Sequence, residues 1–276
     1  MICIHHNDLD GKCAAAIVKR AMKPLLPVFI EADYKDSLPG HGIIGGENVV
    51  IVDFSYKPED MKEIIKNASS IIWIDHHETA KDYFYQDLPG LRDFSDKGMS
   101  GCELTWAYYY PDKPAPRVVR LIGDYDKWSL QMLDSKVFYE GMKLLENKPE
   151  SEIWNDLLAD FTPDIEAIIK AGRTAIIYRD NYCNELCNAF GYETEINGRR
   201  AYACNQYMFG SGGFGHRFAQ YPLCVAYIYD GKKFTVSLYS ETVDVGEIAK
   251  SHGGGGHKGA SGFVCSELPF VKCERK

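Results

Sequence analysis

The stretch IWIDHHETA, residues 72–80, runs from a β-rich apolar segment directly into one aspartate and two adjacent histidines. A single histidine at the end of a strand is commonly a core residue with a satisfied hydrogen bond. Two imidazoles that follow Asp75, at the point where the apolar run stops, are more typical of a ligand set. His76 and His77 therefore indicate a site here, provided that other segments bring carboxylates to the same place.

Strand and helix patterns alternate on both sides of this stretch. Apolar β-rich runs occupy 2–6, 28–33, 48–54 and 69–75, and helical patterns occupy 11–22, 57–68, 100–110 and 117–123. This alternation predicts an α/β fold in which an N-terminal domain, residues 1–133, forms a doubly wound, mainly parallel sheet.

The pattern changes twice further along the chain. Residues 134–189 are almost wholly helical in pattern and predict a helical connector. Residues 190–276 carry two hairpin signals, Asn197-Gly198 and Asp230-Gly231, each between alternating runs, and a short helical pattern before a glycine run. We therefore expect a smaller α+β C-terminal domain at 190–276.

Composition limits the class of protein. The chain has 276 residues, 45% of them hydrophobic, and no apolar run approaches the ~18 residues of a membrane span. The first residues, MICIHHNDLDGK, show no export signal. The nine cysteines are scattered without a C-x-x-C pair, and packing explains the helical pair Cys183 and Cys187. These features predict a reduced, cytoplasmic, globular protein without membrane association.

The charge of −8 is unevenly distributed. Residues 190–276 hold 10 Lys and Arg against 8 Asp and Glu, whereas residues 1–189 hold 21 against 31. An acidic protein lacks the field that neutralises the phosphates of long nucleic acids, which disfavours a generic nucleic-acid binder. An acidic half can instead concentrate divalent cations.

Acidic residues follow several of the predicted strands. Asp8 and Asp10 follow the first strand, Asp53 ends VVIVD, and Asp124 lies in LIGDYDKW. Because the carboxyl ends of parallel strands meet at one edge, these carboxylates and His76 should lie together. Oxygen and imidazole ligands without thiolates favour Mn²⁺ or Mg²⁺ over structural zinc. Taken singly, HNDLDG is equally compatible with a turn or a helix cap, and it lacks the later acids of a calcium loop.

Two glycine-rich segments lie in the C-terminal part. SHGGGGHKGASG, residues 251–262, is compatible with a flexible linker, but an apolar FVC follows and places the loop between ordered elements. Unhindered backbone N–H groups can wrap a phosphate, and two basic side chains add charge. The predicted phosphate-binding residues are Gly253, Gly254, Gly255, Gly256, His257 and Lys258, and a second loop, GSGGFGHRF at 210–218, adds His216 and Arg217.

Taken together, HNDLDG, VDF, DHH and GDYD resemble, in order and spacing, the four motifs of the DHH phosphoesterase superfamily. That superfamily includes RecJ-type exonucleases, family II inorganic pyrophosphatases, exopolyphosphatases and nano-RNase/cyclic-dinucleotide phosphodiesterases. VDVGEIAKSHGGGGHKGASG resembles the glycine-rich motif of the C-terminal substrate domain in the nuclease-like branch, and HNDLDG is especially similar to the nano-RNase B type. Only the helical middle of the chain has no counterpart among these motifs.

The resemblance implies a role for each matching residue. The implied ligands of two metal ions are Asp8, Asp10, Asp53, His76 and Asp124, with Asp53 as the bridge. His6 stays open as a ligand, because it lies two residues before Asp8, whereas the pyrophosphatase branch places its histidine four before. The resemblance also implies that Asp75 orients an imidazole, that His77 faces the substrate phosphate, and that Ser240 contacts the substrate.

The sequence therefore predicts a phosphoesterase that uses two divalent ions, Mn²⁺ first and Mg²⁺ or Co²⁺ as alternatives, to activate water. The expected substrates are short oligonucleotides or small nucleotides, namely nano-RNA, linear dinucleotides and pAp. Two alternatives stay open: an exopolyphosphatase or inorganic polyphosphate hydrolase, and a nucleotide-binding regulator without turnover. A homodimer also stays open.

Overall fold

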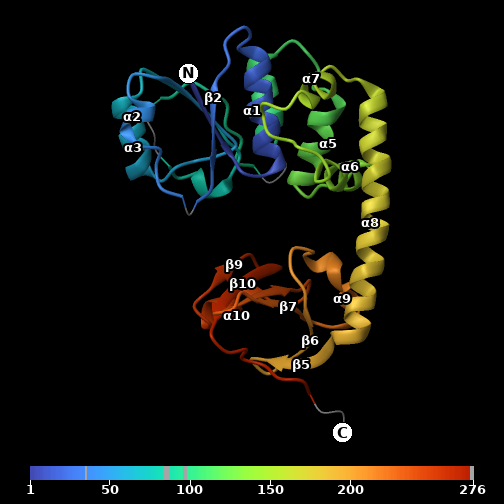
Figure 1. The fold of residues 1–276 in the computed structure, drawn as a ribbon. Coiled ribbons are helices and arrows are strands. Elements are labelled where there is room, and N and C mark those ends of the chain that lie inside the picture. Colours follow the sequence, from blue (N-terminus) through green and yellow to red (C-terminus); the bar gives the residue numbers. More distant parts are fainter. Residues whose placement is uncertain (35, 84–86, 96–97, 274–276) are drawn as a thin grey trace. The chain divides into compact units, whose positions relative to one another are not determined.

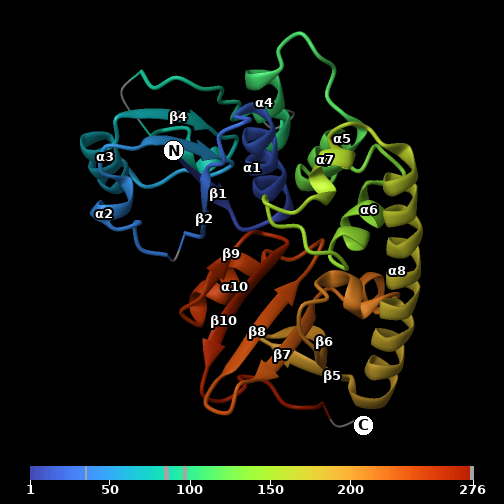
Figure 2. The same ribbon diagram turned by 45° about the horizontal axis from the view of Figure 1, so that its top comes forward.

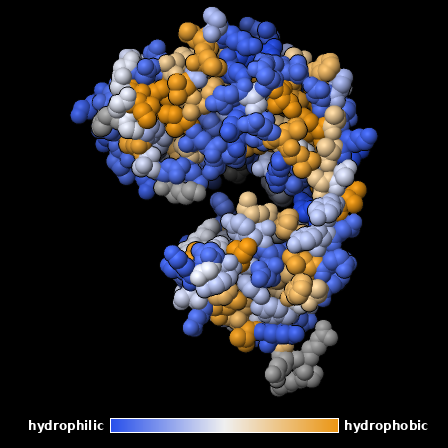
Figure 3. All heavy atoms as spheres, in the orientation of Figure 1, coloured by the Kyte–Doolittle hydropathy of each residue, from blue (hydrophilic) through white to orange (hydrophobic). Residues whose placement is uncertain are grey.

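The computed structural model describes residues 1–34, 36–83, 87–95 and 98–273, which form two compact units, Met1–Ala175 and Ile176–Lys276 (Figure 1). None of the described helices is long and apolar enough to cross a membrane. In the space-filling view, polar and apolar side chains are intermixed on the visible face of each unit (Figure 3).

The first unit is built on a four-stranded parallel sheet. Its strands are β1 (Ile2–His6), β2 (Val28–Ala32), β3 (Asn48–Val52) and β4 (Ser70–Ile74), in the order β2-β1-β3-β4. The chain passes from β1 to β2 on one side and then returns to β3 on the other side. The strand order thus reverses between β1 and β3, which is where open α/β sheets bind ligands.

Helices cover both faces of this sheet, which confirms the predicted doubly wound fold (Figures 1 and 2). Successive strand residues point to opposite faces, so Val50 packs in one apolar cluster and Ile51 in the other. The first cluster includes residues of α1 (Leu9–Ala21), α4 (Gly101–Tyr109) and α5 (Arg117–Asp126). The second includes residues of α2 (His41–Ile44) and α3 (Pro58–Asn67).

The start of α1 fixes the loop that follows β1. Asp8 caps the helix, since its Oδ1 accepts a hydrogen bond of 2.9 Å from the backbone N–H of Gly11. A Cβ atom at position 11 would lie 2.4 Å from the carbonyl oxygen of His6. Glycine at this position therefore allows α1 to begin directly against the end of β1, which holds the acidic loop in place.

The helical middle of the chain does not form a separate layer. It contains α6 (Ser135–Met142), α7 (Ile153–Leu157) and the 29-residue α8 (Thr162–Phe190). Phe138, Trp154 and Ile165 pack into the first cluster, whereas Cys187 packs in the second unit. The boundary between the units therefore falls inside α8, after Ala175, and differs from the predicted limits at 133 and 189.

The second unit carries a six-stranded mixed sheet. Its strand order is β5-β6-β7-β8-β10-β9, and only the β6–β7 pair is parallel. The strands are β5 (Tyr192–Ile196), β6 (Arg199–Asn205), β7 (Cys224–Tyr229), β8 (Phe234–Tyr239), β9 (Gly255–Gly256) and β10 (Ala260–Cys265). With α9 (Arg217–Gln220) and α10 (Val245–Ser251), they confirm the predicted α+β fold (Figure 2).

The two predicted hairpins join β5 to β6 and β7 to β8. Asn197 and Gly198 both have positive φ, 48° and 73°, as the tight turn between β5 and β6 requires. At the outer side of β5, the chain's final described segment lies against the strand. The N–H of Cys273 donates to the Glu193 carbonyl at 2.9 Å, and the Thr194 hydroxyl donates to the Val271 carbonyl at 2.7 Å.

Candidate metal centre

Asp53 lies at the carboxyl end of β3, beside the point where the strand order reverses. Its side chain is buried and its backbone has a φ of 55°, a left-handed conformation that aspartate adopts more readily than most residues. A Cβ at Gly101 would lie 2.5 Å from Asp53 Oδ1. The glycine at the start of α4 therefore leaves the space that the carboxylate occupies.

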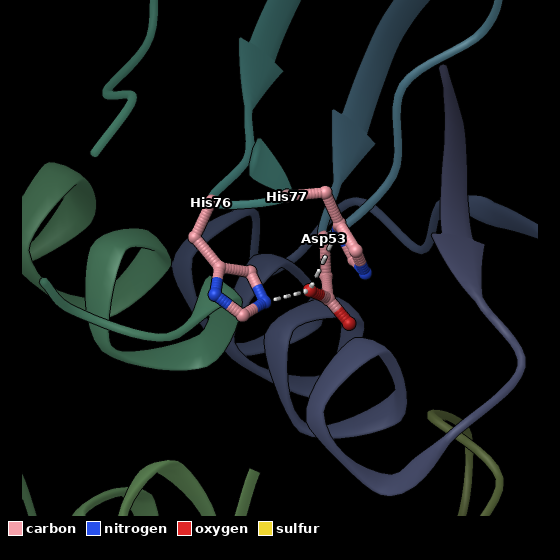
Figure 4. A group of neighbouring side chains, drawn as sticks. All are labelled: Asp53, His76 and His77. Atoms are coloured by element: carbon pink, nitrogen blue, oxygen red, sulfur yellow. Dashed lines mark ion pairs between the residues drawn. The ribbon is translucent and has the colours of Figure 1, made fainter. Parts of the chain in front are cut away.

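Two histidines approach Asp53 from different strand ends. His76 Nε2 lies 3.1 Å from Asp53 Oδ1. Figure 4 shows this contact together with that of His77, whose Nδ1 lies 3.9 Å from the same oxygen. His6 Nδ1 lies 3.8 Å from Asp53 Oδ2 and 2.9 Å from Asp8 Oδ2. His76 Nε2 also lies 3.4 Å from Asp126 Oδ2 and 3.9 Å from Asp10 Oδ2.

The side chains of the centre form three overlapping donor groups, of which Asp53, His76 and His77 are the one drawn in Figure 4, and the other two extend it to both sides. The first of these two contains His6, Asp8 and Asp53, and the second contains Asp10, His76 and Asp126; in all three groups the ligand atoms lie within 4.8 Å of one another. Asp53 is a member of the first group and, through its contact with His76, adjoins the second. The structure thus brings together the predicted Asp8, Asp10, Asp53 and His76, includes His6, and adds Asp126.

Several buried oxygens of the centre have no hydrogen-bond partner within the described part of the chain. They are both carboxylate oxygens of Asp53 and Oδ2 of Asp10. Buried polar atoms are normally satisfied, and a carboxylate can be satisfied by a cation as well as by a donor. Carboxylates and imidazoles are suitable ligands for Mn²⁺ and related divalent ions. The residues present therefore fit a pair of divalent cations.

The charges of the centre support the same conclusion. Burial, followed by the charges of Asp10 and Asp8, raises the pKa of Asp53 well above its usual value. Burial, again followed by Asp10 and Asp8, raises the pKa of Asp126 to about 9. Burial lowers the pKa of His76, which favours the neutral imidazole that a metal needs. Without cations, the carboxylates of this cluster repel one another.

Backbone and hydroxyl donors hold the acidic ligands so that one oxygen of each faces the cluster. Asp10 Oδ1 accepts from the Ser100 hydroxyl at 2.9 Å and from the N–H of Cys102, at the start of α4, at 3.1 Å. Asp8 Oδ1 caps α1, so its Oδ2 is left for the contact with His6. Asp8 therefore combines the capping role that its sequence allowed with a place in the candidate centre.

Asp75 and His77 form a connected polar pair beside the ligands. Asp75 is fully buried and accepts hydrogen bonds from the Ser55 hydroxyl and, at 2.8 Å, from His77 Nδ1. Ser55 in turn accepts from the Trp73 indole N–H at 3.0 Å. Burial acts to lower the pKa of His77, but the hydrogen bond and charge of Asp75 more than offset it, so the pKa is raised. Asp75 thus fixes the ring of His77 and favours its cationic form.

The structure does not bring the predicted Asp124 into the centre. Its two oxygens accept from the backbone N–H groups of Gln131 and Met132, at 2.9 and 3.0 Å, and so hold the loop after α5. Asp126, which the sequence reasoning missed, lies there instead. The helical spacing in the sequence could have indicated Asp126, because it follows Ile122 by four residues and Val119 by seven and so lies on the apolar side of the helix.

In the second unit, the glycine run is an ordered hairpin rather than a flexible linker. β9 pairs with β10, and a Cβ at Gly254 would lie 2.1 Å from the carbonyl oxygen of Gly262. Gly256 has a φ of 139°, which side chains rarely allow. The side chains of His257 and Lys258 are exposed at the hairpin. The predicted phosphate contacts of Gly253, Gly254, Gly255, Gly256, His257 and Lys258 stay predictions.

The other two predicted substrate residues are engaged within the second unit. The buried Ser240 donates its hydroxyl to the Pro222 carbonyl at 2.6 Å and accepts from the N–H of Val243 at 2.8 Å. Arg217 is also buried and donates to the side-chain oxygens of Asn184, at 3.1 Å, and Asn188. Neither side chain lies free at a loop surface.

A comparison with known families matches the part of the chain that holds all the residues of the centre except Asp126. The DHH family, N-terminal domain, matches residues 1–122. The chain resembles the solved pGpG-specific phosphodiesterase PggH from Vibrio cholerae, with 14% identity, a TM-score of 0.54 and coverage of 96% of this chain and 94% of that one. It also resembles the solved DHH domain of a member of a ribosomal protein family, at 15% identity, TM-score 0.59 and 96% and 82% coverage. These likenesses support the observed fold.

One relative is similar in sequence over most of the chain. Uncharacterized protein R106 of Acanthamoeba polyphaga mimivirus is 27% identical over 264 residues. The match covers 90% of this chain but 62% of that relative, so the chain spans less than two thirds of its length.

Proposed function

We propose that this protein is a metal-dependent phosphoesterase of the DHH family, because residues 1–122 match the N-terminal domain of that family. The observation that carries the proposal is the position of Asp53. Its buried carboxylate, without a hydrogen-bond partner in the described residues, lies between two groups of carboxylate and imidazole donors. Such an arrangement suits a bridging ligand of two cations.

The donor groups define which residues would hold each ion. His6 and Asp8 would hold one, Asp10, His76 and Asp126 the other, and Asp53 both. Mn²⁺ is the preferred ion by ligand chemistry, with Mg²⁺ or Co²⁺ as alternatives. When bound, two such ions activate a water molecule and neutralise charge that develops on a phosphoryl group.

The chain's own hydroxyl and thiol groups beside the centre are poorly suited to attack a phosphate. Ser55 and Ser100 are buried, 2% and 0% exposed, so a bound substrate has little access to their hydroxyls, which donate to Asp75 and Asp10. Burial, followed by hydrogen bonding with Cys13, raises the pKa of Cys102 well above its usual value, which keeps the thiol protonated. We therefore propose that water, rather than one of these side chains, attacks the phosphate.

His77 would bind the phosphate rather than a metal. Because Asp75 accepts the proton of Nδ1, the other ring nitrogen is left for a ligand, and the raised pKa favours a cationic ring. A cationic imidazole held by a buried carboxylate can donate to a phosphate oxygen.

We further propose that the substrates are short oligonucleotides or small nucleotides, such as linear dinucleotides or pAp. The formal net charge of −8 disfavours binding of long strands, and the glycine hairpin with His257 and Lys258 offers backbone and charge for one phosphate. The fold shared with a pGpG-specific phosphodiesterase is compatible with a linear dinucleotide.

The test is a hydrolysis panel of di- to pentanucleotide RNA, pGpG, pAp and polyphosphate. With Mn²⁺, the nucleotides should be cleaved; chelation should abolish turnover, and Mn²⁺ should restore it. Asp53→Asn is the control, because it retains shape but removes charge between the cations and should cost orders of magnitude in rate. Full turnover after exhaustive metal removal would exclude the metal mechanism, and cleavage of polyphosphate alone would exclude the nucleotide assignment.

A further inference from the structure

The second unit contains a cavity of ≈ 770 Å³ that is formed entirely by its own residues. This volume is within the range of small-molecule sites. Its walls come from the end of α8, from β5, β6 and α9, and from the segment that lies along β5. The lining residues are Asn188, Gly191, Tyr192, Glu193, Tyr202, Arg217, Tyr221, Lys272 and Cys273. The candidate metal centre uses none of them.

A buried positive charge lies in the wall of this cavity. The Arg217 residue is only 6% exposed, and its guanidinium donates to two neutral amide oxygens, those of Asn184 and Asn188. Its carbon lies 5.5 Å from the ring centre of Tyr202. No carboxylate forms an ion pair with Arg217 among residues 1–34, 36–83, 87–95 and 98–273. Burying a charge without a counter-ion is costly, so an anion in the cavity would be stabilised.

The acidic residue among those that line the wall does not neutralise Arg217. Glu193 is engaged by Arg200, at 3.2 Å, and accepts a hydrogen bond of 2.8 Å from the Tyr221 hydroxyl. Lys272 adds a second cation to the wall, and its side chain is exposed. The wall of the cavity therefore carries two positive charges, on Arg217 and Lys272, and one negative charge, on Glu193, which is already paired with Arg200. This balance makes the site suitable for an anion.

The wall also contains three tyrosines. The rings of Tyr202 and Tyr221 are 5.0 Å apart, Arg200 lies 4.6 Å from the ring centre of Tyr221, and Tyr192 lines the same space. Gly191 is required for this arrangement, because a Cβ there would lie 2.2 Å from the Tyr202 hydroxyl. Aromatic side chains beside an arginine are a common surface for a nucleobase with a phosphate.

We propose that this cavity is a second ligand site, which binds a nucleoside monophosphate through Arg217, Lys272 and the tyrosine wall. The phosphate is the anion that the two cations bind, and the base packs against the tyrosines. The site is independent of the metal ions, because all of its residues belong to the second unit.

The experiment is calorimetric titration of AMP, adenosine and inorganic phosphate into the metal-free full chain. Without metals the acidic centre repels phosphates, so binding reports on the second unit, and the variants below separate the cavity from the glycine hairpin. AMP should bind at one site, and at least about tenfold more tightly than adenosine or phosphate, because it uses both the charged and the aromatic walls. Lys272→Glu should weaken AMP binding at least about tenfold, and Tyr221→Ala should weaken it as well.

Three controls give the result its meaning. Lys232→Glu makes the same charge change on an exposed turn and should leave AMP affinity unchanged. His257→Ala should also leave it unchanged, because His257 belongs to the glycine hairpin. Hydrolysis of bis-p-nitrophenyl phosphate by metal-loaded Lys272→Glu should be normal. The proposal would be overturned if AMP did not bind saturably, or if Lys232→Glu lowered the AMP affinity as much as Lys272→Glu. It would also be overturned if His257→Ala lowered the AMP affinity and Lys272→Glu did not. These outcomes do not depend on whether the enzyme turns over.

Discussion

At the scale of single residues, Asp124 and Asp126 lie on opposite sides of α5 and have different roles. A step of two residues rotates a side chain by about 200° around a helix axis. Asp126 is directed to His76, whereas Asp124 is directed to the N–H groups of the following loop. One carboxylate therefore belongs to the candidate centre and the other to the structure that supports it.

This division predicts different effects for two matched substitutions. Asp126→Asn should lower metal content and reduce kcat/KM by more than about 100-fold, because even residues behind a metal ligand typically contribute 10–100-fold. Asp124→Asn should retain metal content and rate within a few-fold, but lower the melting temperature, because an amide oxygen cannot replace both loop contacts. Metal analysis, kinetics and thermal melting of both proteins test this. Loss of metal from Asp124→Asn alone would show that our assignment is reversed.

The same residues show what could be inferred from the sequence. Asp8, Asp10, Asp53 and His76 could be predicted together, because each follows or adjoins a strand of a parallel sheet and such ends converge. Arg217 could not be placed, because its partners lie on α8, far away in sequence, and only the folded chain brings them to it.

At the scale of elements, the sequence patterns predicted each strand of the first sheet. β1, β3 and β4 are mostly buried and therefore strongly apolar, whereas the edge strand β2 is largely exposed or half-buried and was indicated by the β-rich run VFIEAD, residues 28–33. The helical character of the middle of the chain was also predicted, but its division between the units was not. That division depends on which side chains reach each core: Phe138 packs in the first and Cys187 in the second. A helical pattern alone carries no such information.

The β9–β10 hairpin gives a prediction for one of its side chains. If His257 contacts a substrate phosphate other than the one that reacts, His257→Ala should reduce kcat/KM for a dinucleotide by about 10- to 100-fold, the size of a charge-assisted hydrogen bond. Bis-p-nitrophenyl phosphate has no second phosphate and should lose far less. Kinetics with both substrates, at equal metal content, make the comparison. An equal reduction for both would place His257 at the reacting group, and no reduction would remove it from the substrate site.

At the scale of the whole molecule, the acidic centre couples folding to pH. A carboxyl group has a pKa of about 4 in an unfolded chain, and that of Asp126 is raised to about 9 in the fold. The folded state thus holds a proton that the unfolded state releases. The protonated Asp126 carboxyl therefore contributes stability that is complete below about pH 4 and is lost as the pH rises from about 4 to 9.

The metal-free protein should therefore melt at progressively lower temperature between pH 5 and pH 9, with a loss of up to about 1.4 kcal/mol per pH unit from one such group. Saturating Mn²⁺ should remove this trend, because cations replace the protons and bind better as the ligands ionise. Melting curves across this range, with and without Mn²⁺, test the prediction, and Asp126→Asn should flatten the metal-free curve. A metal-free melting temperature that rises with pH would contradict it.

The position of the final described segment beside β5 has a consequence for self-association. Free strand edges are the places where one sheet can be extended by another chain. In the second unit, one edge strand, β5, already hydrogen bonds with Val271 and Cys273, and the other, β9, has only two residues. The cover is partial at both edges, because the segment occupies one backbone carbonyl of β5, that of Glu193, and β9 pairs with only Ser261 and Gly262 of the six-residue β10. A second copy that extends this sheet would therefore have to pair with the uncovered backbone of β5 or β10, and removal of the segment beside β5 should favour such pairing.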